Sequence, residues 1–194
     1  MSERIHLALC GERGTGKSTC IRRVIEELRP DIYGFITKSI PGSEEGFHDI
    51  FIHPASQPES ERVRERRNQI GSCNKVIHRV NTDVFETLGV QLLSTAGPTD
   101  AAGAQYSGNN EIIVMDELGF MENEAATFQK CVMERFNGDI PVIAAIKPIV
   151  WSSFINNIRC HDKVEVIPLY ERTREEVYAY VLERLTGIMI NNKK

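Results

Sequence analysis

Short apolar segments alternate along the chain with longer segments in which apolar residues recur every three or four positions. The short segments are typical of buried strands, and the longer segments are typical of amphipathic helices. We predict strands over residues 5–10, 33–37, 47–53, 111–115, 140–146 and 164–167. We predict helices over residues 16–29, 122–136, 152–157 and 172–185, and one more helix after residues 81–83 that carries Val84, Leu88 and Leu92 on one face.

This alternation of strands and helices predicts an α/β fold, with helices on both faces of a mainly parallel sheet. Turn residues at 40–46 before the alternating segment 47–53 add a small β-hairpin to the three-layer sandwich. The polar, glycine-rich residues 96–110 are predicted to be a loop. Because no linker divides the chain, we expect one domain over residues 1–194, in which residues 54–75 are a possible lid or insertion.

The composition excludes several classes of protein. The chain has 27 acidic and 23 basic side chains and a formal charge of −4, which gives no general basic surface for nucleic acid. No apolar run approaches the roughly 18 residues of a membrane span, and the start of the chain does not fit a signal peptide. The five cysteines form no CxxC pair, so we interpret them as small buried hydrophobes. A cytoplasmic protein without membrane association is expected.

A candidate phosphate-binding loop follows the first predicted strand. Residues 11–18 read GERGTGKS and fit the pattern GxxxxGK[ST] between an apolar strand and an amphipathic helix. Glycine at three of these positions allows successive backbone N–H groups to turn toward a phosphate. Lys17 is expected to reach the β- and γ-phosphates, and the Ser18 hydroxyl is expected to bind Mg²⁺. The predicted nucleotide-binding residues are Gly11, Glu12, Arg13, Gly14, Thr15, Gly16, Lys17, Ser18 and Thr19.

Two adjacent carboxylates, Asp116 and Glu117, end the apolar segment 112–115. Ligands of open α/β sheets collect at the carboxyl ends of the strands, so we expect both side chains to lie beside the phosphate loop. Asp116 is predicted to hold Mg²⁺ together with Ser18. Glu117 is predicted to be a catalytic general base that orients or deprotonates an attacking water. A carboxylate there favours hydrolysis, because a kinase needs an acceptor in that space.

The motifs resemble those of the THEP1-type nucleoside-triphosphatases, a family of small P-loop proteins. Beyond the phosphate loop, the resemblance is carried by residues 33–37 (YGFIT), 46–47 (GF), 81–85 (NTDVF), 115–122 (MDELGFME) with Phe128, and 173–175 (TRE). The most specific match is residues 115–122. The resemblance implies a RecA-like sheet and Mg²⁺-dependent hydrolysis of several nucleoside triphosphates to the diphosphate and phosphate. Where the family usually has an arginine after the first segment, this chain has Lys38.

Other basic residues are candidates for contacts with the phosphates. The resemblance points to Arg174 as a catalytic residue, at the start of a helix near the ligand edge. Lys17 is the second basic catalytic candidate, and Lys147 follows a strand at the same edge. The four arginines within residues 62–67 could form a lid over the triphosphate, but a solvated charged segment is the favoured interpretation.

Three further residues alternate along one predicted strand, namely His48, Asp49 and His53. Without other ligands nearby, we interpret them as structural or exposed rather than as metal ligands. Trp151 and Phe154 are expected to pack in the core or at the start of a helix.

The leading hypothesis is a hydrolase that acts on ATP, GTP and other nucleoside triphosphates with Mg²⁺. One alternative is a P-loop kinase for a nucleotide or small molecule, with its acceptor under residues 54–75. Another is a nucleotide-dependent switch for a protein or nucleic-acid partner. The sequence does not identify a base preference or a protein partner.

Overall fold

One sheet forms the centre of the molecule. In the residues that the computed structural model describes, 3–94, 110–170 and 172–191, eight strands follow the order β5-β4-β3-β2-β6-β7-β1-β8. The strands are β1 (His6–Cys10), β2 (Asp31–Pro41), β3 (His48–Pro54), β4 (Gln69–Cys73), β5 (His78–Val80), β6 (Glu111–Leu118), β7 (Val142–Ile146) and β8 (Val164–Pro168). The strands from β2 to β8 in that order are parallel, whereas β3, β4 and β5 continue the sheet in antiparallel fashion. The predicted α/β fold with a mainly parallel sheet is confirmed.

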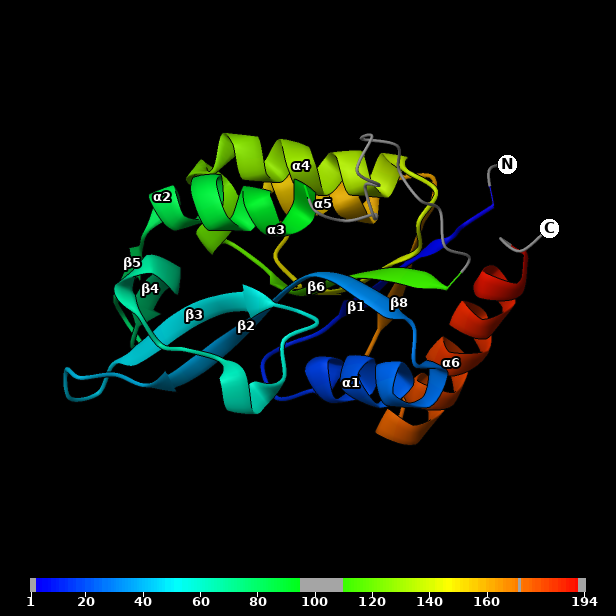
Figure 1. Cartoon of the computed structure of the whole chain (residues 1–194), viewed down its shortest axis with the longest axis horizontal. Coiled ribbons are helices and arrows are strands. Elements are labelled where there is room, and N and C mark those ends of the chain that lie inside the picture. The colour runs from blue at the N-terminus through cyan, green and yellow to red at the C-terminus, as the bar shows by residue number, and fades with distance from the viewer. Residues whose placement is uncertain (1–2, 95–109, 171, 192–194) are drawn as a thin grey trace.

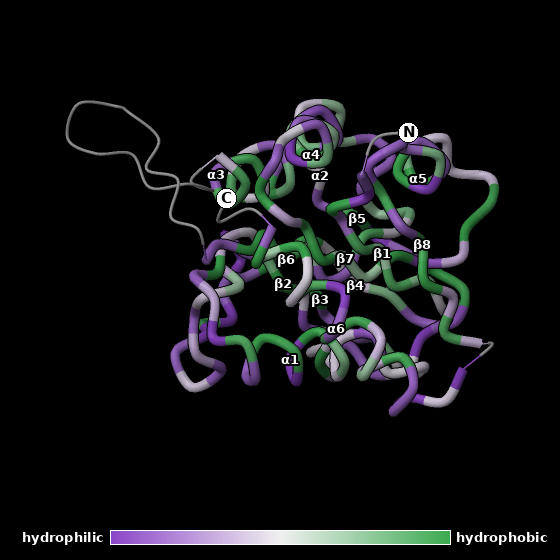
Figure 2. Tube along the Cα trace, turned by 90° about the vertical axis from the view of Figure 1, so that its right-hand side faces the viewer, coloured by the Kyte–Doolittle hydropathy of each residue, from purple (hydrophilic) through white to green (hydrophobic). Residues whose placement is uncertain are grey.

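Helices cover both faces of this sheet. The α-helices are α1 (Lys17–Leu28), α2 (Thr82–Val84), α3 (Val90–Ser94), α4 (Ala126–Asn137), α5 (Ser153–Arg159) and α6 (Arg174–Asn191). A π-helical segment, η3 (Phe85–Gly89), joins α2 to α3, and short 3-10 turns form η1 (Glu59–Glu61), η2 (Arg66–Asn68) and η4 (Met121–Glu124). Figure 1 shows α1 and α6 on one face of the sheet and α3, α4 and α5 on the other. The view turned by 90° in Figure 2 shows the strands between these two helical layers.

The continuous apolar segments form the central parallel strands, because helices cover both faces of the sheet there. Every residue of β1 and of β7 is buried. On one face, Phe128 of α4 packs against Phe35 and Phe85 with ring centroids 5.5 and 5.2 Å apart. On the other face, α1 and α6 pack their apolar sides on the sheet. This rigid centre holds the carboxyl ends of β1, β6 and β7 side by side.

The antiparallel part of the sheet is larger than the predicted hairpin. Residues 69–73, which lie in the segment considered as a lid or insertion, pair with β3 as strand β4. A Cβ at Gly71 would lie 2.2 Å from the carbonyl oxygen of Arg79, so glycine is needed for the close approach of β5. Residues 69–73 therefore belong to the sheet. The predicted loop at 96–110 lies outside the described residues, apart from Asn110.

Some predictions about burial were wrong. All five cysteines are free, but only Cys10 and Cys20 are buried, and Cys160 is exposed. Phe154 is in the core, as expected, whereas Trp151 lies at the start of α5, directly before the N-cap Ser152, but is 69% exposed and does not pack there. Within the described residues, no helix has the length and apolar character that crossing a membrane requires.

Candidate active site

The loop between β1 and α1 has the backbone conformation that a phosphate cradle requires. Gly14 and Gly16 have φ angles of 84° and 105°, a region that side chains other than glycine rarely adopt. Gly16 is the N-cap of α1 and places the positive end of the helix at the loop. The predicted helix start at residue 16 is thus one residue early. The loop is shaped to bind an anion.

Lys17 ties this loop to the neighbouring strand β6. Its ammonium donates hydrogen bonds to the carbonyl oxygens of Gly11 at 2.6 Å and Glu12 at 2.9 Å. The same nitrogen lies 3.0 Å from Oε1 of Glu117, and the lysine side chain is only 5% exposed. The most buried positive charge of the loop therefore faces the carboxylate that was predicted to be the general base.

The two predicted metal ligands are in direct contact. The Ser18 hydroxyl donates a hydrogen bond of 2.9 Å to Oδ1 of Asp116. Burial raises the pKa of Asp116 to about 6, while the hydrogen bond from Ser18 opposes that rise. A buried carboxylate beside a hydroxyl is an oxygen pair that suits Mg²⁺.

Glu117 is positioned by the adjacent strand β2. Its backbone N–H donates to Oγ1 of Thr37 at 3.2 Å, in a region where Ile36 pairs with Asp116. Strand β6 runs on to Leu118 rather than ending at residue 115, with a register shift between Asp116 and Leu118 against β7. Both neighbouring carboxylates thereby line the same cavity.

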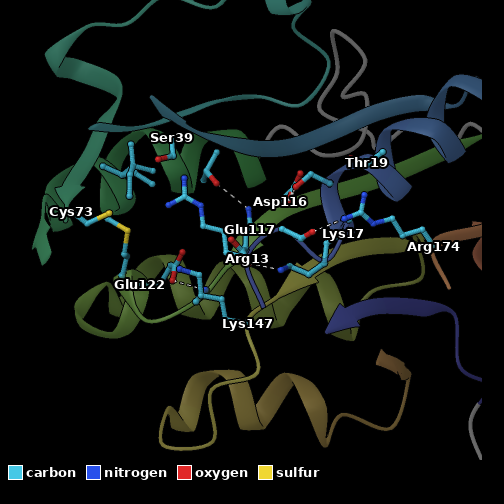
Figure 3. Close-up of a pocket in the computed structure, with 18 residues that line it drawn as sticks. Arg13, Lys17, Thr19, Ser39, Cys73, Asp116, Glu117, Glu122, Lys147 and Arg174 are labelled. Atoms are coloured by element: carbon cyan, nitrogen blue, oxygen red, sulfur yellow. Dashed lines mark hydrogen bonds and ion pairs between the residues drawn. The ribbon is translucent and has the colours of Figure 1, made fainter. Parts of the chain in front are cut away.

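That cavity, of about 340 Å³, collects most of the predicted residues (Figure 3). The residues predicted from the sequence that line it are Arg13, Gly14, Gly16, Lys17, Ser18, Thr19, Asp116, Glu117, Lys147 and Arg174. Gly11 and Glu12 are not among the lining residues but supply the carbonyl oxygens that hold Lys17. Thr15 stabilises the loop itself, because its hydroxyl donates to the Glu12 carbonyl oxygen at 2.9 Å.

Two further basic side chains lie at different edges of the cavity. Arg174, at the start of α6, donates from Nη2 to the carbonyl oxygen of Gly14 at 2.9 Å and lies against Gly16. Lys147, after β7, packs along Gly119, with its ammonium 4.8 Å from the centre of the Phe120 ring. Both side chains line the cavity together with the loop.

Glu122 belongs to the motif 115–122 but is not among the predicted site residues. Its side chain is 2% exposed, lines the cavity, and accepts a 2.9 Å hydrogen bond from the N–H of Gly119. Burial raises the pKa of Glu122 to about 7, against the opposing effects of that N–H and of Lys147. Thr37 and Ser39 of β2 line the cavity as well and were also missed. No local pattern in the sequence marks them, because they reach the cavity through the pairing of β2 with its neighbouring strands.

Several other candidates lie elsewhere. Lys38, which stands where the family has an arginine, pairs with Glu59 at 2.9 Å, and both side chains are exposed. None of the arginines of residues 62–67 lines the cavity, and all but Arg62 are exposed. Arg62 is half-buried and donates to the carbonyl oxygen of Gln57 at 3.0 Å. The favoured interpretation of a solvated segment fits these positions better than a lid.

One of the two histidines of β3 is packed inside the fold. His53 is buried, and its Nδ1 lies 3.4 Å from the side-chain nitrogen of Asn68. Among the described residues, no group of three or more His, Cys, Asp or Glu side chains is arranged to hold a metal ion.

Three features together define a P-loop NTPase. A glycine-rich cradle follows a central strand, a lysine begins α1, and an acidic pair lies two strands away from the cradle. A family model described as NTPase matches residues 6–182, so the chain belongs to that family of nucleoside-triphosphatases, and the resemblance seen in the motifs is confirmed. The chain is 26% identical to the nucleoside-triphosphatase THEP1 of Methanocaldococcus jannaschii, over 93% of this chain and 97% of that protein. It is 27% identical to a cancer-related nucleoside-triphosphatase homolog of Mus musculus, over 89% and 92% of the two chains.

Solved structures of relatives share the fold. The crystal structure of THEP1 from Aquifex aeolicus superposes with a TM-score of 0.67 at 22% identity and covers 93% of this chain and 98% of its own. The solution structure of a human cancer-related nucleoside triphosphatase gives a TM-score of 0.59 at 21% identity, with 94% and 96% covered. The α/β architecture is therefore common to all three chains.

Proposed function

We propose that the chain is a Mg²⁺-dependent nucleoside-triphosphatase that hydrolyses ATP, GTP and other nucleoside triphosphates to the diphosphate and phosphate. The observation that carries this proposal is the contact of Lys17 with Glu117 directly beside the contact of Ser18 with Asp116. The first pair joins a phosphate-binding cation to a general base, and the second pair offers oxygen ligands for a metal. The relatives are named nucleoside-triphosphatases, which supports the same reaction.

The residues at the proposed metal site fit Mg²⁺. Ser18 and Asp116 would hold the ion, and few protein ligands suffice because Mg²⁺ usually keeps water and substrate phosphate in its shell. When bound, the ion would neutralise charge on the β- and γ-phosphate oxygens. The buried Asp116 carboxylate, whose pKa is raised by burial, is stabilised by any cation placed beside it.

The other steps of the reaction are assigned to backbone and side-chain groups of the protein. The N–H groups of the loop, Lys17 and Arg174 bind and orient the triphosphate. A γ-phosphate beside Lys17 competes with Glu117 for the ammonium and leaves this carboxylate available to a water molecule. The water oxygen attacks the γ-phosphorus, its proton passes to Glu117, and the nucleoside diphosphate leaves.

The cytoplasmic location expected from the sequence is also part of the proposal. It is supported by the five cysteines, which are all free, as is usual in reducing compartments.

Incubation of the purified chain with ATP or GTP, with Mg²⁺ or with EDTA, tests the reaction. We expect equal amounts of diphosphate and inorganic phosphate with Mg²⁺, and neither with EDTA. The Lys17→Met variant, purified in the same way, measures the activity of any contaminating phosphatase. Tight nucleotide binding with no phosphate release above this control would contradict hydrolysis and favour a switch.

A further inference from the structure

The cavity extends past the phosphate loop and the acidic pair to the antiparallel part of the sheet. We call this extension the acceptor chamber and define it by Ser39, Ile50, Ile70, Cys73 and Met121. These residues come from β2, β3, β4 and η4, not from the phosphate loop. Figure 3 shows Cys73 and Arg174 at opposite ends of the cavity, with Lys17 and Glu117 between them.

The antiparallel strands place this wall by their register. Ser39 pairs with Ile50, and Ile50 pairs with Gly71. Ile70 and Cys73, which flank Gly71 in β4, both line the cavity. A Cβ at Gly71 would lie 2.7 Å from Cε of Met121, so the glycine lets β4 pack tightly on Met121. The acceptor chamber is thus bounded by tightly packed strands.

The chemistry of the wall is that of a binding site for an organic molecule. Ile50, Ile70 and Met121 supply an apolar surface, which an attacking water does not require. Within the described residues, the Ser39 hydroxyl oxygen is buried and has no hydrogen-bond partner. A buried hydroxyl without a partner is unfavourable, so it is suited to the polar end of a ligand.

The chamber opens toward the reacting groups. Glu117, Glu122 and Lys147 line the cavity together with the chamber and the phosphate loop. The cavity lining carries basic side chains, among them Arg13 and Lys147, and carboxyl groups, among them Glu117 and Glu122, so no single sign of charge dominates it. A hydroxyl of a molecule in the chamber can therefore take the place of the attacking water beside Glu117.

We propose that the chamber binds a small uncharged alcohol with a short apolar body and a second polar group, and that the chain transfers the γ-phosphoryl group to its hydroxyl. This inference rests on the proposed function, because the phosphate loop must hold a nucleoside triphosphate. The acceptor oxygen forms a bond to the γ-phosphorus, and the bond from that phosphorus to the bridging oxygen breaks. The electron pair leaves with the nucleoside diphosphate, and the hydroxyl proton passes to Glu117 and then to solvent.

Phosphorus NMR of products tests the transfer. Wild-type chain is incubated with ATP, Mg²⁺ and tetramethylene glycol, a butanediol with a hydroxyl at each end, and in parallel with ethanol at the same concentration. The chamber predicts a phosphate monoester of the diol, with a ratio of ester to inorganic phosphate about tenfold above that for ethanol. Equal ratios for the two alcohols, or phosphate as the only product with both, would overturn the proposal while leaving hydrolysis intact. The absence of both phosphate and ester would instead show that the proposed hydrolysis is wrong.

Two variants locate the acceptor. Cys73→Phe fills the far end of the chamber and is expected to lower the ester-to-phosphate ratio about tenfold. Its matched control is Ser72→Phe, the neighbouring residue of the same strand, which does not line the cavity and should leave the ratio unchanged. Ser39→Ala removes only the hydroxyl and should lower the ratio for the diol but not for ethanol, which keeps the test valid if the phenylalanine variant does not fold. Equal ratios in Cys73→Phe and Ser72→Phe, or no effect of Ser39→Ala, would contradict an acceptor in this chamber.

Discussion

The ammonium of Lys17 lies 3.0 Å from the carboxylate of Glu117, across the space between the phosphate loop and β6. Within the described residues, Oε1 of Glu117 is buried and has no hydrogen-bond partner beyond this ion pair. A buried lysine and a buried carboxylate oxygen therefore compensate each other before substrate binds. Substrate phosphate would take over the lysine, so the same contact links nucleotide binding to the release of the base.

Replacing Lys17 with methionine should weaken nucleotide binding. The loss of a hydrogen bond to a charged group costs about 1.5–3 kcal/mol, which corresponds to roughly a 10- to 150-fold loss of affinity. Isothermal titration with a non-hydrolysable ATP analogue and Mg²⁺ measures this change. Lys130→Met is the control, because Lys130 is an exposed residue of α4 that lies 3.9 Å from Glu134. Similar affinities in the two variants would show that Lys17 does not bind phosphate.

Replacing Arg174 with alanine should lower the rate of hydrolysis. The guanidinium lies on the phosphate loop through its hydrogen bond to Gly14, so its charge is available to a bound triphosphate. A charged hydrogen bond of this kind predicts a decrease of about 10- to 100-fold in kcat/KM. Arg172→Ala is the matched control, since Arg172 stacks over Tyr180 and does not line the cavity. An equal decrease in both variants would assign Arg174 a general electrostatic role only.

Glu122 should make the stability of the fold depend on pH. Burial raises its pKa from 4.5 to about 7, so between these values the folded chain holds a proton that the unfolded chain has released. This contribution is complete below about pH 4.5 and is lost as the pH rises through 7. Glu122→Gln cannot titrate, so the unfolding free energy of the wild type relative to this variant should fall by about 3 kcal/mol between low and neutral-to-alkaline pH. Urea denaturation at several pH values measures the difference, and a constant difference would contradict the buried carboxyl.

Gly89 should be a steric constraint on the core. A Cβ there would lie 2.8 Å from Cδ2 of Phe128, so Gly89→Ala should destabilise the fold by about 1–3 kcal/mol. In a Phe128→Leu background the same change should cost less, because the ring edge is gone. Gly187→Ala in α6 meets no atom within 4 Å and should instead stabilise slightly. Thermal denaturation compares the variants, and the same sign for both glycines would be inconsistent with this packing.

The sequence predicts the parallel part of the fold well for a physical reason. The predicted strands at 5–10, 140–146 and 164–167 lie within two residues of β1, β7 and β8, because a strand buried on both faces needs a continuous apolar segment. Strand β4 has no such pattern, since Gln69–Cys73 mixes polar and small residues. Its pairing with β3, rather than its own propensity, makes it a strand.

The candidate site also has a part that the sequence predicts and a part that it does not. The phosphate loop and the pair Asp116–Glu117 could be predicted because their chemistry depends on residues that are adjacent in sequence. Thr37 and Glu122 could not, because their positions depend on the register of β2 with β6 and on the turn that follows β6. Tertiary pairing, which local patterns do not encode, brings them to the cavity.

The central claim is that Glu117 activates the attacking water. Glu117→Gln keeps the size and polarity of the side chain but cannot accept a proton, so phosphate release from ATP should fall by about 100- to 10,000-fold while nucleotide binding is retained. Phosphate release and binding of the non-hydrolysable analogue, measured on the same preparation of wild type and variant, test this directly. Turnover of Glu117→Gln at the wild-type rate would contradict the assignment.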